Sequence, residues 1–139
     1  MRTQAVLLGR LTIPGRPTCL HAAREFIART LGSDHARLDT AVLLTSELVT
    51  NSVKHSESGR PGGTVTVTLL SVPDRIRVEV IDDGSENVPA LRLGEAESPE
   101  LAESGRGLQL AEFLSANWGY YRDTAGTVTW FELTEQPDE

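Results

Sequence analysis

The sequence predicts an α/β (α+β) two-layer sandwich in which helices cover one face of a mixed, mostly antiparallel sheet. Two observations support this fold class. Apolar residues recur at helical spacing in two stretches between residues 17 and 56, and polar and apolar residues alternate in two stretches between residues 64 and 80. Further strands are expected near both ends of the chain, so the sheet would combine distant segments above one helical layer.

Length and composition limit the class of function. The chain has 139 residues, 39% of them hydrophobic and 24% charged, which fits one globular domain over residues 1–139. Its formal net charge of −7 disfavours direct binding to nucleic acid, because a protein that follows phosphates needs a basic face. There is one cysteine, no apolar run of about 18 residues and no cleavable apolar leader. We therefore expect a cytoplasmic protein without internal disulfides and without a membrane-spanning segment.

The first strand and the first helix follow from short apolar patterns. Residues 5–13 are mostly apolar, and Pro14 and Gly15 predict a turn after them. Apolar residues spaced three, one and four apart then predict an amphipathic helix from Pro17 to Leu31. Pro17 suits the first turn of this helix and Gly32 suits its end.

The remaining elements are predicted in the same way. Ser33 or Asp34 can cap a second helix that runs to about Ser56. The alternating segments 64–69 and 75–80 predict a hairpin that turns at Pro73 and Asp74, with one buried and one solvated face. Residues 82–104 have no sustained period, and a loop of this length in a compact domain is usually functional. A third helix over residues 105–117 and strands near 118–122 and 127–133 complete the prediction.

The stretch SELVTNSVKH, residues 46–55, is unusual for a core helix. At about 100° per residue, its apolar positions share one face, while Glu47, Asn51 and His55 line one edge of that face. One interpretation is a solvated edge with ordinary hydrogen bonds. The other is a site in which Glu47 acts as a base and Asn51 binds a hard cation such as Mg²⁺, which keeps several waters and prefers phosphate partners.

Two further segments favour the second interpretation. The segment VEVIDDG ends a predicted strand in Asp82 and places Gly84 in the turn; a carboxylate at this place could accept a hydrogen bond from the amine of adenine. The segment ESGRGL opens the predicted third helix with Gly105 and Gly107, whose amides could approach a phosphate at the positive end of the helix. Each motif alone is more often a turn or a packing feature, but the combination is specific.

The motifs ELVTNSVKH, IDDG, ESGRGLQL and GTVTWFEL resemble the four characteristic boxes of the Bergerat-fold (GHKL) ATPases. Within that superfamily they look most like the anti-sigma-factor serine kinases of the RsbW/SpoIIAB type, in the short form abundant in actinobacteria. The resemblance covers nearly the whole chain, and the four boxes occur in the family's order.

The resemblance implies roles for individual residues. Glu47 would be the general base, Asn51 would bind Mg²⁺, and Asp82, supported by Gly84, would receive the adenine amino group of ATP. Residues 85–104 would form the lid over the nucleotide. The resemblance places the following residues in the nucleotide site as well: His55, without an assigned step; Gly105, Arg106, Gly107 and Leu108 near the phosphates; and Thr127 or Thr129 beside Asp82.

Two features of the sequence leave alternatives open. The family's second box is usually DxGxG, but here Glu86 replaces the second glycine, and an acid near a triphosphate opposes binding unless it faces solvent or metal. Arg106 could pair with phosphate oxygens or lie exposed on the surface. Other site chemistries are disfavoured, because the chain has no GxxxxGK[ST] motif and its histidines and cysteine lack the spacing of a zinc site.

The expected function is that of an ATP-dependent serine/threonine protein kinase and anti-sigma factor. By resemblance, it would phosphorylate a small anti-anti-sigma factor of the STAS type and sequester a sigma factor when that antagonist is phosphorylated. A homodimer with contacts from the first strand and first helix is also implied. The alternatives are a non-catalytic partner-switching module, in which ATP is structural or absent, and a simple ATPase of the same fold.

Overall fold

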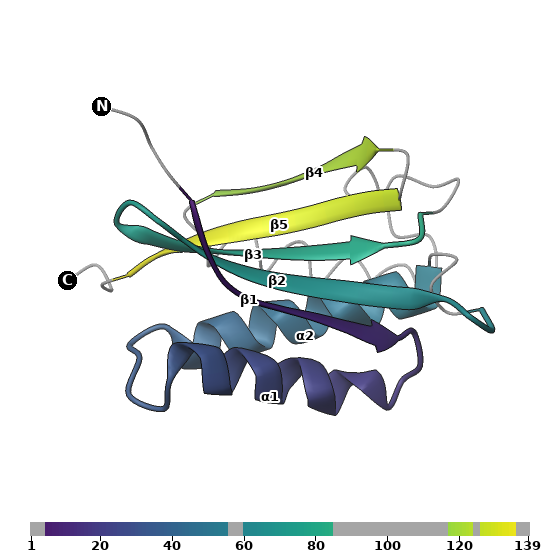
Figure 1. Ribbon diagram of the computed structural model, residues 1–139, viewed down its shortest axis with the longest axis horizontal. Helices are drawn as coiled ribbons and strands as arrows, with labels where there is room; N and C mark the ends of the chain where they lie inside the picture. The colour runs from purple at the N-terminus through teal and green to yellow at the C-terminus, as the bar shows by residue number, and fades with distance from the viewer. Residues whose placement is uncertain (1–4, 56–59, 85–116, 124–125, 136–139) are drawn as a thin grey trace, which may run out of the picture.

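The computed structural model describes residues 5–55, 60–84, 117–123 and 126–135, and all structural statements concern these residues (Figure 1). The side chains of His55 and Asp123 are not described. The elements are β1 (Val6–Pro14), α1 (Cys19–Leu31), α2 (Leu38–His55), β2 (Thr64–Val72), β3 (Arg75–Asp82), β4 (Asn117–Asp123) and β5 (Gly126–Thr134).

The sheet has five strands in the order β1-β2-β3-β5-β4, and every described pair is antiparallel. This arrangement confirms the predicted sheet and its mainly antiparallel character. β2 and β3 form the predicted hairpin, because Val72 pairs with Arg75 and only Pro73 and Asp74 lie between them. Asp74 makes this tight turn with a φ of 62°. β3 lies at the centre of the sheet, between β2 and β5.

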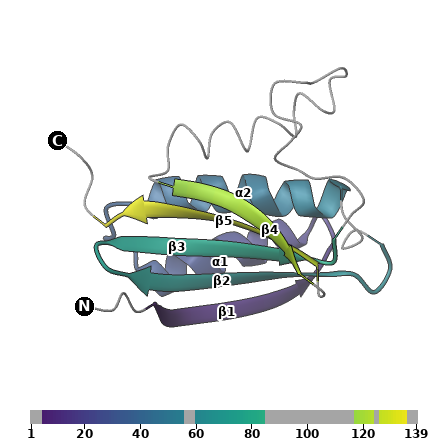
Figure 2. The same ribbon diagram turned by 90° about the horizontal axis from the view of Figure 1, so that it is seen from above.

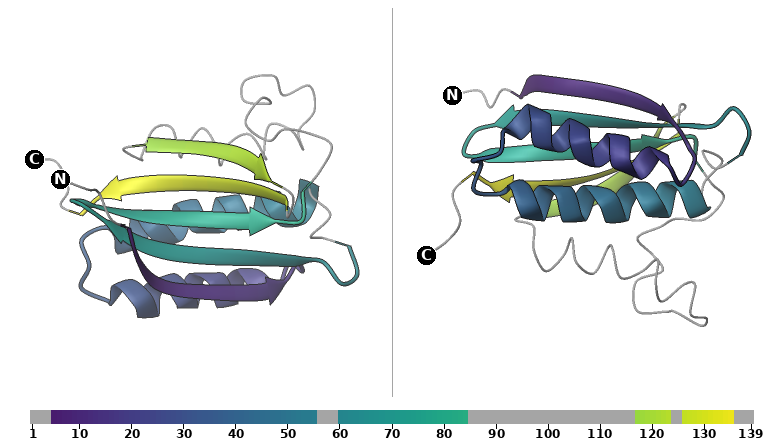
Figure 3. Two further views of the ribbon diagram at one scale, coloured as in Figure 1. Left: turned by 45° about the horizontal axis from the view of Figure 1, so that its top comes forward. Right: turned by 90° about the horizontal axis from the view of Figure 1, so that it is seen from below.

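Both helices pack on one face of the sheet, as predicted (Figures 2 and 3). The period of two along β3 buries every second residue on that face. Ala23 and Ile27 of α1 and Leu44 and Val49 of α2 are fully buried against these strands. The resulting core between the layers holds the helices in fixed positions relative to the end of β3. β3 and α2 end on the same side of the molecule (Figure 1).

The start of each helix differs from the prediction. α1 begins at Cys19, and Pro17 lies in the turn before it. α2 begins at Leu38 rather than directly after Ser33 or Asp34, which are exposed in the connection between the helices. The chain uses residues 32–37 as consecutive turns to reverse its direction, and the backbone N–H of Leu38 donates to the carbonyl of His35 at 3.1 Å.

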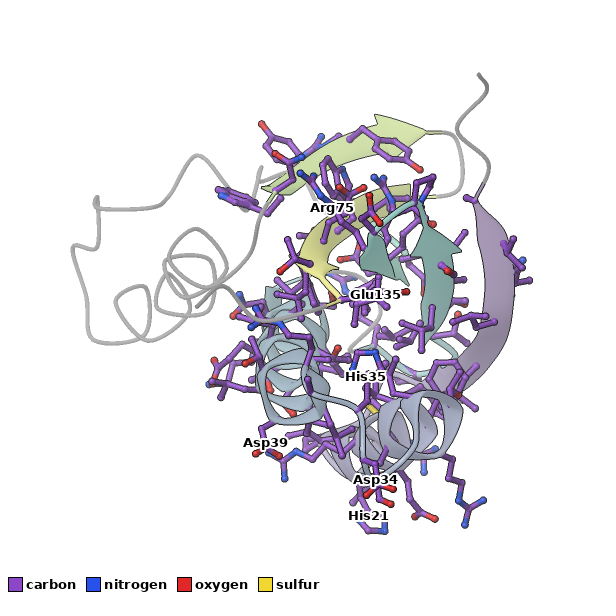
Figure 4. The ribbon with its side chains drawn as sticks, turned by 90° about the vertical axis from the view of Figure 1, so that its left-hand side faces the viewer. His21, Asp34, His35, Asp39, Arg75 and Glu135 are labelled. Carbon is purple, nitrogen blue, oxygen red and sulfur yellow. The ribbon has the colours of Figure 1, made fainter. Side chains whose placement is uncertain are left out.

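Figure 4 shows the end of the sandwich at which the two helices are connected, with Asp34 and His35 in that connection and Arg75 in the sheet. The predicted end of α1 is confirmed, because Gly32 has a φ of 93° and its N–H donates to the carbonyl of Ala28.

The opposite face of the sheet carries a polar network over its central strands. The guanidinium of Arg77 lies 3.9 Å from the centre of the Trp130 ring and donates to Glu132 at 3.1 Å. A Cβ at Gly119 would lie 3.0 Å from that ring, so the glycine lets the indole lie close across β4. Cation–π and charge-assisted contacts of this kind stabilise neighbouring strands.

The predicted helix over residues 105–117 and the predicted lid over residues 85–104 lie almost entirely outside the described residues. Asn117, placed at the end of that helix by the sequence, is the first residue of β4. No helix in the described part of the chain is both long enough and apolar enough to span a membrane.

Candidate functional site

Helix α2 has the asymmetric face that the sequence predicts. Leu44, Leu48 and Val49 are buried against the sheet, while Glu47 and Asn51 are half-buried at the margin of that face. These two polar residues lie one helical turn apart, so their side chains leave the helix in the same direction. His55 is the last residue of α2, so its predicted place in the site is described only for its backbone.

Asp82 ends β3 with a side chain that is only 6% exposed. Its carboxylate accepts a hydrogen bond from the backbone N–H of Gly84 at 2.7 Å. It also accepts hydrogen bonds from the backbone N–H of Thr127 and from the hydroxyl of Ser52 on α2. The three donors come from a turn, a strand and a helix, so the carboxylate is held in position from three sides.

The environment of Asp82 shifts the pKa of its carboxyl group. Burial raises the pKa of its carboxyl, and the neighbouring Asp83 adds to that increase, while the donors from Gly84, Ser52 and Thr127 act in the opposite direction. Burial has the largest effect, and the pKa remains above its ordinary value. A carboxyl group kept in such a setting is a candidate for a specific binding contact.

Two glycines allow the chain to close around this carboxylate. Gly84 has a φ of 87°, and Gly126, which opens β5, has a φ of 152°. A Cβ at Gly126 would lie 1.7 Å from the carbonyl oxygen of Asp82, which no side chain can tolerate. The close approach of the two backbones therefore requires glycine at position 126.

The two threonines of β5 lie on the face of the sheet that the helices cover. Thr127 pairs directly with Asp82, and Thr129 pairs with Val80 further along β3. Their side chains are buried, with exposed fractions of 2% and 6% respectively. Both could serve the purine end of a site, and Thr127 is the nearer to the end of β3.

The described residues thus bring together Asp82, Gly84, Thr127 and Thr129, with Glu47 and Asn51 on the adjoining helix. The predicted phosphate-binding residues Gly105, Arg106, Gly107 and Leu108 lie outside the described residues, as does Glu86.

Sequence reasoning missed two contributors, Ser52 and Gly126. The helical pattern places Ser52 only on the apolar face of α2, although a hydroxyl on such a face is itself a signal of a buried partner. Gly126 opens the last box, but its importance depends on the register between β3 and β5.

The described part of the site has the chemistry needed to hold an adenine nucleotide. The buried carboxylate of Asp82 can only accept hydrogen bonds when it is ionised, and it therefore suits an amino group on a base. No cluster of three or more histidine, cysteine or acidic side chains suitable for a metal occurs in the described ranges. The side-chain oxygen of Asn51 fits a cation that takes few protein ligands and relies on phosphates and water, as Mg²⁺ does.

Comparison with known proteins agrees with this geometry. Residues 13–133 match the family described as the histidine kinase-like ATPase domain. The chain is 31% identical over 134 residues to the serine-protein kinase RsbW of Listeria monocytogenes serotype 4a (strain HCC23), covering 91% of this chain and 78% of that protein. It is 30% identical, with the same coverage, to the serine-protein kinases RsbW of Listeria monocytogenes serovar 1/2a and of Listeria innocua serovar 6a.

Proposed function

Because the chain belongs to the family of histidine kinase-like ATPase domains, and within it to the RsbW-type serine-protein kinases, we propose that it phosphorylates an anti-anti-sigma factor and thereby controls a sigma factor. The chain is a serine/threonine protein kinase that uses ATP. We further propose a protein substrate, regulatory partners, a Mg²⁺ ion and roles for individual residues.

The observation that best supports the proposal is the buried carboxylate of Asp82 beside helix α2. Asp82 and the threonines of β5 would hold the adenine end of ATP, and Asn51 would hold Mg²⁺ nearer the phosphates. When bound, Mg-ATP would supply the phosphoryl group that is transferred, and its Mg²⁺ ion would neutralise negative charge on the phosphate oxygens. Glu47 would accept the proton of the substrate hydroxyl, which is the task of a general base next to the reacting group.

The regulatory partners follow from the family. The chain would sequester a sigma factor while the anti-anti-sigma factor, a small STAS-type protein, is phosphorylated. Sigma factors act in the cytoplasm, so the assignment implies a cytoplasmic protein. A homodimer through β1 and α1 is also part of the proposal, and the exposed apolar residues of β1 support it.

A phosphotransfer assay tests the function. The purified protein is incubated with ATP labelled at the γ-phosphate and with candidate STAS-type proteins, and label on the candidate is measured. The wild type is expected to label one of them, and Glu47→Ala is expected to lose at least about 99% of the transfer rate while still binding ATP. Unchanged transfer by Glu47→Ala would remove Glu47 from the role of base.

The same assay addresses the non-catalytic alternative, which Glu86 in place of a family glycine favours. A partner-switching module predicts a stable complex with the candidate protein and no transferred label. Release of inorganic phosphate without label on any candidate would instead indicate a simple ATPase.

A further inference from the structure

The hydroxyl of Ser52 links α2 to a strand of the sheet. Ser46 and Thr50 each donate a hydrogen bond of 2.8 Å back to a carbonyl of the helix, and Ser46 also accepts a hydrogen bond of 2.8 Å from Nε of Arg24 on α1. Ser52 instead donates to the carboxylate of Asp82 on β3, and its own side chain is only 6% exposed. The hydroxyl therefore links the helix of the site to the strand of the site.

We propose that Ser52 is a positioning residue that sets how strictly the site selects a purine carrying a 6-amino group. The inference rests on the proposed function, in which Asp82 receives the amine of ATP. Ser52 acts through Asp82 and does not touch the base. Its hydroxyl occupies one acceptor position of the carboxylate and leaves another position for the ligand.

The hydrogen-bonding capacity of the carboxylate supports this proposal. An ionised carboxylate offers about four acceptor positions. The N–H groups of Gly84 and Thr127 and the hydroxyl of Ser52 take three of them. About one position then remains for a donor on the ligand. A base that presents an acceptor there, or a hydrogen bound to carbon, leaves that buried position unsatisfied, which costs binding energy.

The position of Ser52 in the sequence adds a second consequence. Ser52 directly follows Asn51 and lies in the second turn after Glu47, so the same stretch of α2 carries the proposed metal ligand and the proposed base. A direct bond from this stretch to Asp82 fixes the distance between the base-recognising end of the site and its reactive end. Without the bond, only the backbone N–H groups of Gly84 and Thr127 hold the carboxylate among the described residues, and neither of them belongs to α2.

A thermodynamic cycle with two ligands tests the proposal. Dissociation constants are measured by calorimetry, in the presence of Mg²⁺, for ATP and for purine riboside 5′-triphosphate, which differs from ATP only by the missing 6-amino group. The proteins are nucleotide-free wild type, Ser52→Ala and the control Ser46→Ala, which removes a buried hydroxyl of the same helix whose partners are Val42 and Arg24. Circular-dichroism melting confirms that each variant is folded.

Wild type is expected to bind ATP roughly tenfold more tightly than the purine analogue, the effect of one hydrogen bond to a charged group. Ser52→Ala should weaken ATP binding roughly tenfold and change binding of the analogue less than about twofold, whereas Ser46→Ala should keep the wild-type selectivity. Equal weakening for both ligands would overturn the proposal, because it would mean that Ser52 acts only through packing. Unchanged ATP binding would overturn it as well.

Two additional variants protect the test against misfolding. Ser52→Thr keeps a hydroxyl and should restore the selectivity for ATP. Ser52→Cys keeps nearly the volume of serine but is a weak donor, so it should reproduce the loss of selectivity even if the alanine variant does not fold. A wild type that binds neither ligand would overturn the proposed function itself, and the role of Ser52 with it. If the wild type selects ATP and Ser52→Cys is equally selective, only the role of Ser52 is overturned.

Discussion

Among the described glycines, Gly126 is the one at which an added Cβ would clash most severely with the surrounding structure. Gly126→Ala would force a Cβ into the carbonyl of Asp82, so the start of β5 must move away from β3. We expect the free energy of unfolding to fall by about 3 kcal/mol or more in urea denaturation. Gly62→Ala is the matched control, because Gly62 also has a positive φ, 84°, but nothing lies within 4 Å of the place that a Cβ would take there.

The control should lose only about 1–2 kcal/mol, the cost of a left-handed conformation alone. Equal losses for the two variants would contradict the view that the contact between Gly126 and Asp82 is the tighter constraint.

Asp82 should make the stability of the nucleotide-free protein depend on pH in a defined direction. Because burial raises the pKa of the Asp82 carboxyl in the folded state, the folded protein retains the carboxyl proton to higher pH than the unfolded chain does. The contribution of Asp82 to stability is therefore present below the ordinary aspartate pKa and declines as pH rises from that value through the raised one.

The difference in unfolding free energy between wild type and Asp82→Asn isolates this contribution, because other groups titrate in both proteins. Chemical denaturation across the acidic range should show the wild type losing stability relative to Asp82→Asn as pH rises. A difference that stays constant, or that changes in the opposite direction, would contradict the assigned environment of Asp82.

At the scale of the elements, the polar network on the open face of the sheet joins β3 to β5. Burial acts to raise the pKa of the Glu132 carboxyl, but hydrogen bonds from Arg77, Arg75 and Asn117 together hold it below its ordinary value. The carboxylate therefore stabilises the fold at pH values above the ordinary glutamate pKa, and this stabilisation is lost as pH falls through the lowered value.

Glu132→Gln should thus lower the free energy of unfolding by about 1–2 kcal/mol at neutral pH, and the loss should shrink toward strongly acidic pH. Glu25→Gln is the control, because Glu25 pairs with exposed partners, Arg29 and His21, on the surface of α1. Its effect should stay within about 0.5 kcal/mol. A loss for Glu132→Gln that is independent of pH would show that packing, and not charge, is responsible.

Strand β1 is suited to contact a second copy of the chain. It is an edge strand, and Val6, Leu7 and Leu8 have exposed fractions of 57%, 55% and 45%. Exposed apolar residues on a strand edge favour pairing with another chain. Leu7→Lys is expected to convert a dimer to a monomer in sedimentation equilibrium, whereas Leu43→Lys, on the 42% exposed Leu43 of α2, should remain dimeric. A monomeric wild type would contradict the proposed dimer.

At the scale of the whole molecule, the features that could be predicted from the sequence are those set by local periodicity. Alternation along residues 64–69 and 75–80 predicts the central hairpin, and helical spacing predicts both the buried face of α2 and the marginal position of Glu47 and Asn51. The helix starts are predicted less well, because Ser33 and Asp34 suit a cap and a turn equally, and the reversal between the helices requires the turn.

The rest of the site depends on contacts between distant segments. The bond from Ser52 to Asp82 exists only once α2 packs on β3, and the need for glycine at position 126 arises only from the register of β3 with β5. Neither can be derived from a local pattern. Motif resemblance supplies the remaining residues of the site, and those near the phosphates stay predictions.

We propose that the end of β3, held by α2 and β5, recognises the adenine of ATP. Calorimetric titration of Mg-ATP into nucleotide-free wild type and Asp82→Asn tests this recognition. We predict saturable binding to the wild type that requires Mg²⁺, and at least tenfold weaker binding to Asp82→Asn, because the amide places a donor where the base needs an acceptor. Equal affinity of the two proteins, or no binding to the wild type, would contradict the claim.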